Sequence, residues 1–426
     1  MTAIALKQSI LAGELDARLV AVYGEDALPY QRARYADAVG QFATVYGKDR
    51  DAFLFSVAGR SELSGNHTDH NHGCVIAASI DLDIIAVASP TDTHIIRLLS
   101  EGFEEDIVDF DAFCKPRAQI LGRSDELIAG MVAGFIKEGY SVGGFDAYTT
   151  SNVLKGSGLS SSAAFEDMIG TILSHLYNGG RVDNVTVAKL AQYAENTFFG
   201  KPCGLMDQLA CAVGGVVAID FADPANPVID QIDFDFTKAG YRLCIVNTGG
   251  NHADLTDDYA SVPREMKAVA AYFGKSCLRE VNEDELIASI PSLRDAVGDR
   301  AILRALHFME ENRRVSLQKK ALSDGDLDAF FARVLESGRS SFCYLQNVYT
   351  NKNVSEQGLS LALCLAENVL RGTKSAYRVH GGGFAGTIQA FVPEEQVESF
   401  RAAMDGAFGA GRCMVLRIRP IGAAKI

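Results

Sequence analysis

The sequence has no excess of positive charge. Its 40 lysines and arginines are outnumbered by 54 aspartates and glutamates, which gives a formal net charge of −14 over 426 residues. Proteins that bind nucleic acids normally carry a basic face, so we expect no nucleic-acid partner. Nucleotide phosphates are still compatible with an acidic chain, because backbone dipoles and Mg²⁺ can hold them.

Long hydrophobic runs are also missing. The longest apolar stretch, residues 75–88, is interrupted by Asp81 and Asp83 and is too short to span a bilayer. The first eight residues lack a basic start followed by a long apolar core, so we expect no signal peptide. The nine cysteines include no C-x-x-C pair, as is typical of small core residues in a reducing compartment. Together these absences favour a cytoplasmic protein that does not associate with membranes.

Several common nucleotide-binding motifs are absent as well. Residues 274–276 end like a Walker A loop, but Val269 stands where that motif requires glycine. No H-R-D and D-F-G pair indicates a protein kinase. Gly156 and Gly158 lack the third glycine of a dinucleotide fingerprint, and no acid about 20 residues further on completes it.

What remains is the composition of a globular protein with helices and strands. Hydrophobic residues make up 48% and charged residues 22% of the chain, which is typical of an α/β or α+β protein. A chain of 426 residues is long enough for two domains. A shift to Asp, Pro and Asn across residues 220–235 marks the expected boundary, which gives domains 1–225 and 226–426.

Hydrophobic periodicity predicts the main elements. Helical spacing predicts helices within residues 1–50, 165–176, 182–199, 262–273, 301–321 and 327–339. Strand-like runs predict strands at residues 52–59, 75–87, 146–152, 216–221, 241–247, 387–392 and 414–420.

One stretch is typical of a ligand site: residues 154–164, with the sequence L-K-G-S-G-L-S-S-S-A-A. Its two glycines let the backbone turn tightly and leave N–H groups open. A helical pattern follows directly, so the loop would feed a helix N-terminus, where free N–H groups and the positive end of the helix dipole attract an anion. An ordinary loop with a serine N-cap is the alternative that this stretch alone leaves open.

Titratable side chains gather at two further places. Residues 60–73 form the densest polar cluster, and four of its side chains could be read as a metal site: His67, Asp69, His70 and His72. No cysteine or second histidine cluster completes the ligand set, so we favour a loop that hydrogen-bonds a small molecule. Asp207 lies among apolar neighbours and is either a helix-capping acid or a site carboxylate, because a buried acid without a partner is costly.

The glycine loop resembles the G-L-S-S-S-A signature of the GHMP small-molecule kinases, and within them the chain resembles the galactokinases. Residues 58–73 are similar to that family's first motif, G-R-x-N-x-x-G-E-H-x-D-Y-N-x-G. Further similarities follow in family order and cover most of the chain: Glu195 and residues 203–208 (A-E and C-G-I-M-D-Q), Tyr259 with residues 274–281 (G-K-x-x-L-R-E-V), and residues 378–386 (R-M-T-G-G-G-F-G-G).

This resemblance implies an α+β, two-domain GHMP-kinase-like fold with mixed sheets and an active site in the cleft between the domains. Residues 1–225 would bind ATP and sugar, residues 226–426 would form the C-terminal GHMP domain, and the final strand would pack back on the first domain. The implied reaction is ATP-dependent phosphorylation of a monosaccharide at its C1 hydroxyl. Galactose is the expected sugar, with ATP and Mg²⁺ as cofactors and a monomeric protein.

The resemblance also implies roles for individual residues. Asp207 matches the catalytic aspartate and Arg60 its partner, while Ser162 and Glu195 match the Mg²⁺ ligands. The matching sugar contacts are Asn66, His67, Asp69, Gly204 and Tyr259. The matching ATP contacts are Lys155, Gly156, Ser157, Gly158, Leu159, Ser160, Ser161, Ser162, Gly382 and Gly383. Two points stay open: whether Asp207 removes the hydroxyl proton or only orients it, and whether the Arg60–Asp207 pair merely holds the fold.

The chain departs from the family pattern at four positions: Asn66 replaces a glutamate, Glu62 an asparagine, His70 a tyrosine and Leu154 a proline. Asn66 matters most, because the glutamate it replaces contacts the sugar. A substrate with a carboxylate at C6, such as galacturonate, would not be repelled by Asn66. A catalytically silent sugar-sensing relative and a dinucleotide-dependent enzyme are the other hypotheses.

Overall fold

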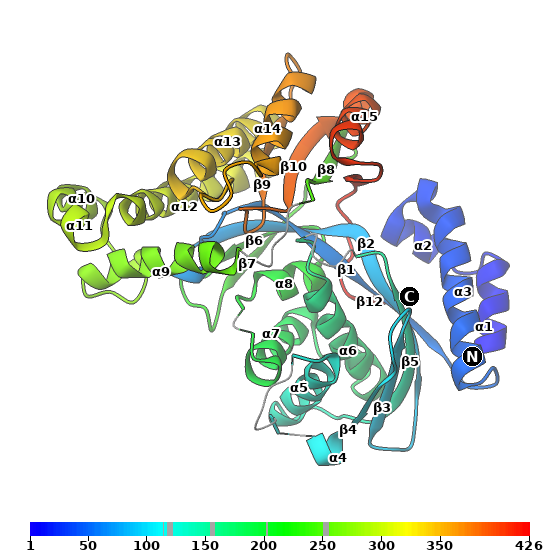
Figure 1. The fold of residues 1–426 in the computed structure, drawn as a ribbon. Coiled ribbons are helices and arrows are strands. Elements are labelled where there is room, and N and C mark those ends of the chain that lie inside the picture. Colours follow the sequence, from blue (N-terminus) through cyan, green and yellow to red (C-terminus); the bar gives the residue numbers. More distant parts are fainter. Residues whose placement is uncertain (114, 117–121, 154–157, 202, 250–254) are drawn as a thin grey trace.

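The computed structural model describes residues 1–113, 115–116, 122–153, 158–201, 203–249 and 255–426 (Figure 1). These residues form two β-sheets flanked by helices, which confirms the predicted α+β class. In the described part of the chain, no helix is both long enough and apolar enough to cross a membrane.

The larger sheet is mixed, and within the described residues it has eight strands. Its main path runs β12-β1-β2-β5-β3-β4, and β6 joins β7 to the first half of β2. The strands are β1 (Phe53–Ser64), β2 (Cys74–Pro90), β3 (Ile95–Ser100), β4 (Asp106–Asp109), β5 (Phe145–Ser151), β6 (Val216–Asp220), β7 (Val228–Ile232) and β12 (Ala424–Lys425). β12 pairs with β1, so the end of the chain returns to the sheet that the N-terminal half builds. β6 and β7 pair on either side of residue 225, and the division into domains there stays a prediction.

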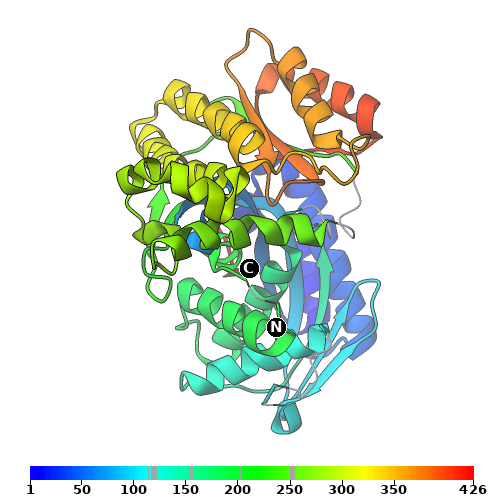
Figure 2. The ribbon, with the colours of Figure 1, turned by 60° about the vertical axis from the view of Figure 1, so that its left-hand side comes forward.

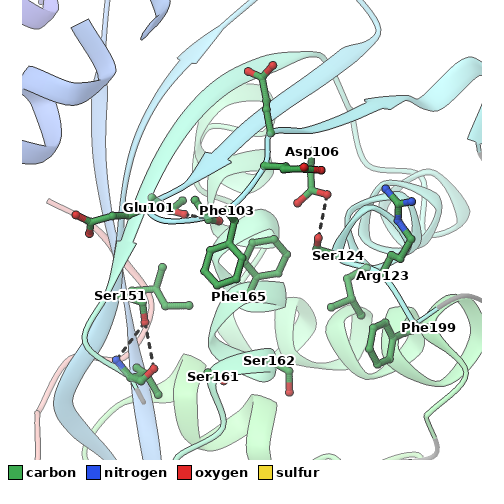
Figure 3. A pocket seen from close by; sticks show the side chains of 18 residues that line it. Glu101, Phe103, Asp106, Arg123, Ser124, Ser151, Ser161, Ser162, Phe165 and Phe199 are labelled. Atoms are coloured by element: carbon green, nitrogen blue, oxygen red, sulfur yellow. Dashed lines mark hydrogen bonds between the residues drawn. The ribbon is translucent and has the colours of Figure 1, made fainter. Parts of the chain in front are cut away.

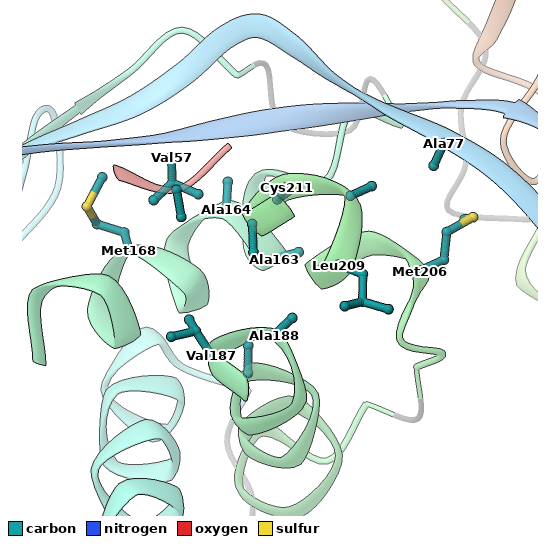
Figure 4. Close-up of a cluster of buried hydrophobic side chains, with 14 of the residues drawn as sticks. Val57, Ala77, Ala163, Ala164, Met168, Val187, Ala188, Met206, Leu209 and Cys211 are labelled. Atoms are coloured by element: carbon teal, nitrogen blue, oxygen red, sulfur yellow. The ribbon is translucent and has the colours of Figure 1, made fainter. Parts of the chain in front are cut away.

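Helices cover both faces of this sheet (Figure 1). Successive side chains of a strand point to opposite faces, so Leu54 packs under α1 (Ala3–Leu11), α2 (Asp16–Tyr23) and α3 (Leu28–Tyr46), while Phe55 joins the core on the other side. That second face carries α5 (Ser124–Lys137), α6 (Ser161–Tyr177), α7 (Asn184–Ala194) and α8 (Met206–Val213). Figure 4 shows α6, α7 and α8 meeting beneath β1 through small and aliphatic side chains such as Ala163, Ala188 and Leu209.

The smaller sheet is antiparallel, in the order β11-β8-β10-β9. Its strands are β8 (Tyr241–Asn247), β9 (Ala376–His380), β10 (Thr387–Pro393) and β11 (Cys413–Leu416). Figure 2 shows β9, β10, β11 and the last helices, orange to red, at one end of the molecule, and β3 and β4, cyan, at the other. The remaining helices are α4 (Phe110–Phe113), α9 (Thr256–Tyr272), α10 (Glu283–Ala288), α11 (Ile290–Val297), α12 (Asp299–Asp324), α13 (Leu327–Ser340), α14 (Gly358–Val369) and α15 (Val397–Phe408).

Short helical turns link these elements: η1 (Glu25–Ala27), η2 (Asp69–Asn71), η3 (Glu195–Phe199), η4 (Leu278–Glu280), η5 (Ser341–Leu345) and η6 (Glu394–Gln396). The core is continuous between the two sheets, because Leu243 of β8 and Phe391 of β10 belong to the same buried cluster as Val57 of β1. The two halves of the chain are therefore packed together rather than merely linked.

A buried ion cluster ties α3, β2 and the C-terminal segment together. Asp83 is fully buried and forms salt bridges with Arg34 and, at 2.8 Å, with Arg419. The hydroxyl groups of Tyr23 and Ser56 also donate to its carboxylate. Burial alone would raise the pKa of Asp83, but the two guanidinium groups hold that pKa below its ordinary value.

We predict that Asp83→Asn lowers the free energy of unfolding by about 3 to 5 kcal/mol, because two buried guanidinium groups lose their shared counter-charge. Urea unfolding measures this change. The control is Asp299→Asn in the exposed Arg294–Asp299 pair, which should leave the urea midpoint unchanged. Equal midpoints for Asp83→Asn and the wild type would contradict the assigned role.

Candidate active site

An ion pair between β1 and α8 forms the centre of the site. Arg60 lies on β1, and its Nε donates to Oδ1 of Asp207, in the first turn of α8, at 2.8 Å. The hydroxyl of Ser160 donates to the other carboxylate oxygen at 2.6 Å. A second nitrogen of Arg60 donates to the carbonyl of Gly158. Arg60 is buried, whereas 34% of the Asp207 side chain is exposed, so the carboxylate is fixed on one side and open on the other.

The surroundings of Asp207 keep its carboxylate charged. Burial would raise its pKa, but the charge and hydrogen bond of Arg60 and the hydrogen bond of Ser160 hold that pKa below its ordinary value. The same ion pair keeps Arg60 protonated. Asp207 is therefore ionised at neutral pH and can accept a hydrogen bond or a proton from a bound hydroxyl group.

The glycine loop passes beside this pair and enters α6. Leu154, Lys155, Gly156 and Ser157 lie outside the described residues. Gly158 has a φ of +72° and Ser160, the N-cap of α6, a φ of +58°. The carbonyl of buried Leu159 accepts a hydrogen bond from the backbone N–H of Arg60 at 3.1 Å. This left-handed turn aims the hydroxyl of Ser160 at Asp207 and leaves Ser161 and Ser162 at the positive end of the α6 dipole.

A cavity of about 760 Å³ opens next to that helix end (Figure 3). Ser161 and Ser162 line one side of it. Figure 3 shows Phe103, from the turn after β3, and Phe165, from α6, facing the same space. The cavity also contains Arg123, Phe199 and acidic groups that include Glu101 and Asp106. It combines an apolar, aromatic part with a helix N-terminus, which suits a planar ring joined to an anionic group.

Glu195, the first residue of η3, is buried among polar side chains. Its carboxylate accepts hydrogen bonds from Lys201 at 2.7 Å and from Gln208 at 2.9 Å. The same amide of Gln208 donates to Glu166 at 3.3 Å, and the other oxygen of the buried Glu166 has no partner among the described residues. Hard oxygen donors of this kind suit Mg²⁺, which usually takes few protein ligands. Ser162 and Glu195 therefore fit the expected cation, although the described residues contain no group of three or more His, Cys, Asp or Glu arranged as a metal site.

Four of the predicted sugar contacts meet at the polar loop after β1. His67, with a φ of +60°, contacts the carbonyl of Gly382 through Nε2 at 2.9 Å, and its ring centroid lies 5.3 Å from that of Tyr259. Burial lowers the pKa of His67 to about 4, so its ring is neutral and Nε2–H donates to this carbonyl. Asp69 lies against Gly204, where an added Cβ atom would be 2.9 Å from the carboxylate.

Asn66 differs from these residues, because its side chain is fully buried and bonded only to other protein groups. The glycine segment, residues 381–384, lies beside it. Gly383 has a φ of +78°, and a Cβ atom there would be 2.0 Å from the carbonyl oxygen of Asn347. Only glycine permits that approach.

Sequence reasoning missed several residues that the structure places at this site. Lys201 and Gln208 hold Glu195, and Ser160 holds Asp207, although Ser160 was expected only as a phosphate contact. Gln208 could have been found, because it follows Asp207 directly in a matching motif. Phe103 had no such signal, because it comes from a turn without a recognisable pattern. Phe199 ends the predicted helical pattern of residues 182–199, but nothing in that pattern marked it as a cavity residue.

The chain is similar to known proteins over most of its length. Residues 126–215 match the GHMP kinases N terminal domain, and residues 40–90 match the galactokinase galactose-binding signature. The chain is 30% identical to the galactokinase of Streptomyces coelicolor over 391 residues, which cover 90% of this chain and 95% of that protein.

The fold is similar to that of solved kinases. The galactokinase of Lactococcus lactis, solved with galactose, superposes with a TM-score of 0.77 at 24% identity, over 92% of this chain and 100% of that one. The mevalonate kinase of Methanococcus jannaschii superposes with a TM-score of 0.60 at 15% identity, over 86% of this chain and 98% of that one. These likenesses agree with the mixed-sheet, two-part layout seen here.

We predict that Gly383→Ala lowers the thermal unfolding midpoint more than Gly381→Ala does. Both glycines have positive φ, which costs an alanine about 1 to 2 kcal/mol. A Cβ atom on Gly381 meets open space, whereas one on Gly383 collides with the backbone of Asn347. Differential scanning calorimetry of the two variants measures the difference, and equal shifts would contradict the close approach.

Proposed function

This chain belongs to the galactokinase family and is a sugar kinase, and from that premise we propose that it transfers the γ-phosphoryl group of ATP to the C1 hydroxyl of galactose. The observation that carries this proposal is the open carboxylate of Asp207, held by Arg60 and Ser160 beside the glycine loop. A sugar hydroxyl on the open side would lie between an ionised acid and the helix end that attracts phosphate.

The sugar would lie against the loop after β1. His67, Asp69, Gly204 and Tyr259 are the expected contacts. Tyr259 is 44% exposed, and its partial burial together with the nearby charges of Asp69 and Asp207 raises its pKa, which supports a common space around these three side chains. Tyr259 therefore stays protonated, and its hydroxyl can donate to an oxygen of the sugar.

Phosphoryl transfer requires mainly positioning and charge stabilisation. Asp207, ionised at neutral pH, orients the C1 hydroxyl and accepts its proton as the bond to phosphorus forms. Arg60 stays cationic and offsets negative charge on the transferred group. Ser160 fixes the second oxygen of Asp207, so that the acid does not rotate away from the hydroxyl.

ATP would occupy the cavity at the N-terminus of α6. The aromatic part formed by Phe103 and Phe165 suits the adenine ring, and the backbone from Gly158 to Ser162 suits the phosphates. Lys155, Gly156 and Ser157 stay predicted phosphate contacts. Mg²⁺, held by Ser162 and Glu195, would neutralise phosphate charge when bound.

We predict that Asp207→Asn lowers kcat by about 10²- to 10⁴-fold, because a carboxamide cannot accept the hydroxyl proton. Sugar affinity, measured by isothermal titration calorimetry, should stay near the wild-type value. The matched control is Asp328→Asn in the exposed Lys374–Asp328 pair, which should retain full kcat. Near-normal turnover by Asp207→Asn would remove its assigned role and leave a purely structural ion pair.

Galacturonate is the second candidate substrate, because position 66 carries no carboxylate that would repel an acid at C6. A comparison of kcat/KM for galactose and galacturonate decides between them. We expect the higher kcat/KM with galactose. If galacturonate gives the higher kcat/KM instead, galacturonate becomes the proposed substrate. Sugar binding without ATP consumption for any aldose would instead favour a silent sugar sensor.

A further inference from the structure

Two departures from the galactokinase pattern are reciprocal. The family motif has asparagine and glutamate where this chain has Glu62 and Asn66. The two side chains touch here, because Nδ2 of Asn66 donates to Oε1 of Glu62 at 3.2 Å, and both are buried. The chain thus has one carboxylate and one carboxamide at these two positions, as the family motif does, but with their places exchanged.

The carboxamide of Asn66 has no capacity left for a ligand. Besides Glu62, its Nδ2 donates to the carbonyl of Gly381 at 2.7 Å. Its Oδ1 accepts from Nδ2 of Asn347 at 2.8 Å and from the hydroxyl of Ser341 at 3.2 Å. A carboxamide offers two N–H donors and two acceptor sites on oxygen, and all four are used.

These bonds join the loop after β1 to the glycine segment, residues 381–384. Asn347 donates to Asn66 and also to the carbonyl of Gly382 at 3.2 Å, and its own carbonyl accepts from the backbone of Phe384. The ring of His67 meets the same carbonyl of Gly382. The side chains that make these bonds hold the glycine segment against the polar loop after β1. We call them the clasp: Asn66, His67 and Asn347.

The charges around positions 62 and 66 explain why the exchange involves both residues. Glu62 forms a salt bridge with the fully buried Arg378, so the carboxylate has a cation at position 62. A carboxylate at position 66 could keep the neutral donors Asn347 and Ser341 on one oxygen, but its other oxygen would face Glu62 and the carbonyl of Gly381. The backbone of residue 66 also donates to Glu311 at 3.3 Å, which is a second negative charge nearby. Glutamate at 66 therefore requires that position 62 lose its charge.

We propose that Glu62 and Asn66 are an interdependent pair, and that Asn66 positions the glycine segment over the sugar instead of binding the sugar itself. The pair fixes where the negative charge of the first motif lies, which is against Arg378. The kinetic consequences rest on the proposed sugar kinase function, whereas the stability consequences do not.

The test compares the wild type with Asn66→Glu, Glu62→Asn and the double exchange Glu62→Asn/Asn66→Glu. Asn66→Glu should lower kcat/KM for galactose by about 100-fold and lower the thermal midpoint, because it buries a second carboxylate without a cation. The double exchange should regain at least about tenfold in kcat/KM and part of the midpoint. A double variant no better than Asn66→Glu in both measurements would overturn the proposal.

A milder pair of variants covers the case in which the charged variants do not fold. Asn347→Ala removes the side-chain bonds from Asn347 to Asn66 and to the carbonyl of Gly382, whereas Ser341→Ala removes a bond to Asn66 that does not reach the glycine segment. Asn347→Ala should raise the KM for galactose about tenfold and leave the KM for ATP within about twofold, and Ser341→Ala should leave both within about twofold. Equal effects of the two variants would show a general structural role and overturn the clasp.

Failure of the proposed function would be seen in the wild type itself, before any variant is compared. If the wild type consumes no ATP with galactose, galactose is not its substrate and the proposed function is wrong. The thermal midpoints of the four proteins then still test the exchanged pair, because the contact between Glu62 and Asn66 exists without substrate.

Discussion

The guanidinium group of Arg60 connects the carboxylate of the active site to its glycine loop. It pairs with Asp207 on α8, donates to the carbonyl of Gly158 in the glycine loop, and lies on β1, whose continuation is the sugar loop. Because Arg60 is buried, each of its donors needs a partner, and the partners available are the acid and the loop. One cation therefore sets the distance between the group that would accept a proton and the loop that would hold the phosphates.

The site also depends on the packing of distant segments, and buried arginines recur at these contacts. Arg419 near the C-terminus meets Asp83 on β2, and Arg378 on β9 meets Glu62 on β1. Each pair joins the N-terminal half of the chain to the C-terminal half. A planar guanidinium group can satisfy several acceptors at once, which suits junctions where strands and loops converge.

Sequence reasoning predicted the parts of this structure that follow from periodicity or short motifs. The helical spacing of residues 165–176 and the strand-like run of residues 52–59 correspond to α6 and β1, and the matching motifs brought Arg60 and Asp207 together. The hairpin of β3 and β4 and the helix α5 were not predicted, and with them the aromatic side of the cavity was missed. Those residues are recognised only when the fold places them around one space. The bond from Ser160 to Asp207 likewise depends on a left-handed backbone turn that no residue pattern announces.

The departures at positions 62 and 66 show that a motif compared one position at a time can be misinterpreted. Read separately, Asn66 lacks a sugar contact and Glu62 adds an acid to the core. Read in the structure, the two side chains share a hydrogen bond, and the acid has Arg378 as its counter-charge. The buried charge and the hydrogen bonds at positions 62 and 66 therefore have to be considered together, because a buried carboxylate is tolerated only where a cation meets it. Substrate preference in this chain therefore has to be argued from the carboxylates that face the open side of the site, which are Asp207 and, against Gly204, Asp69.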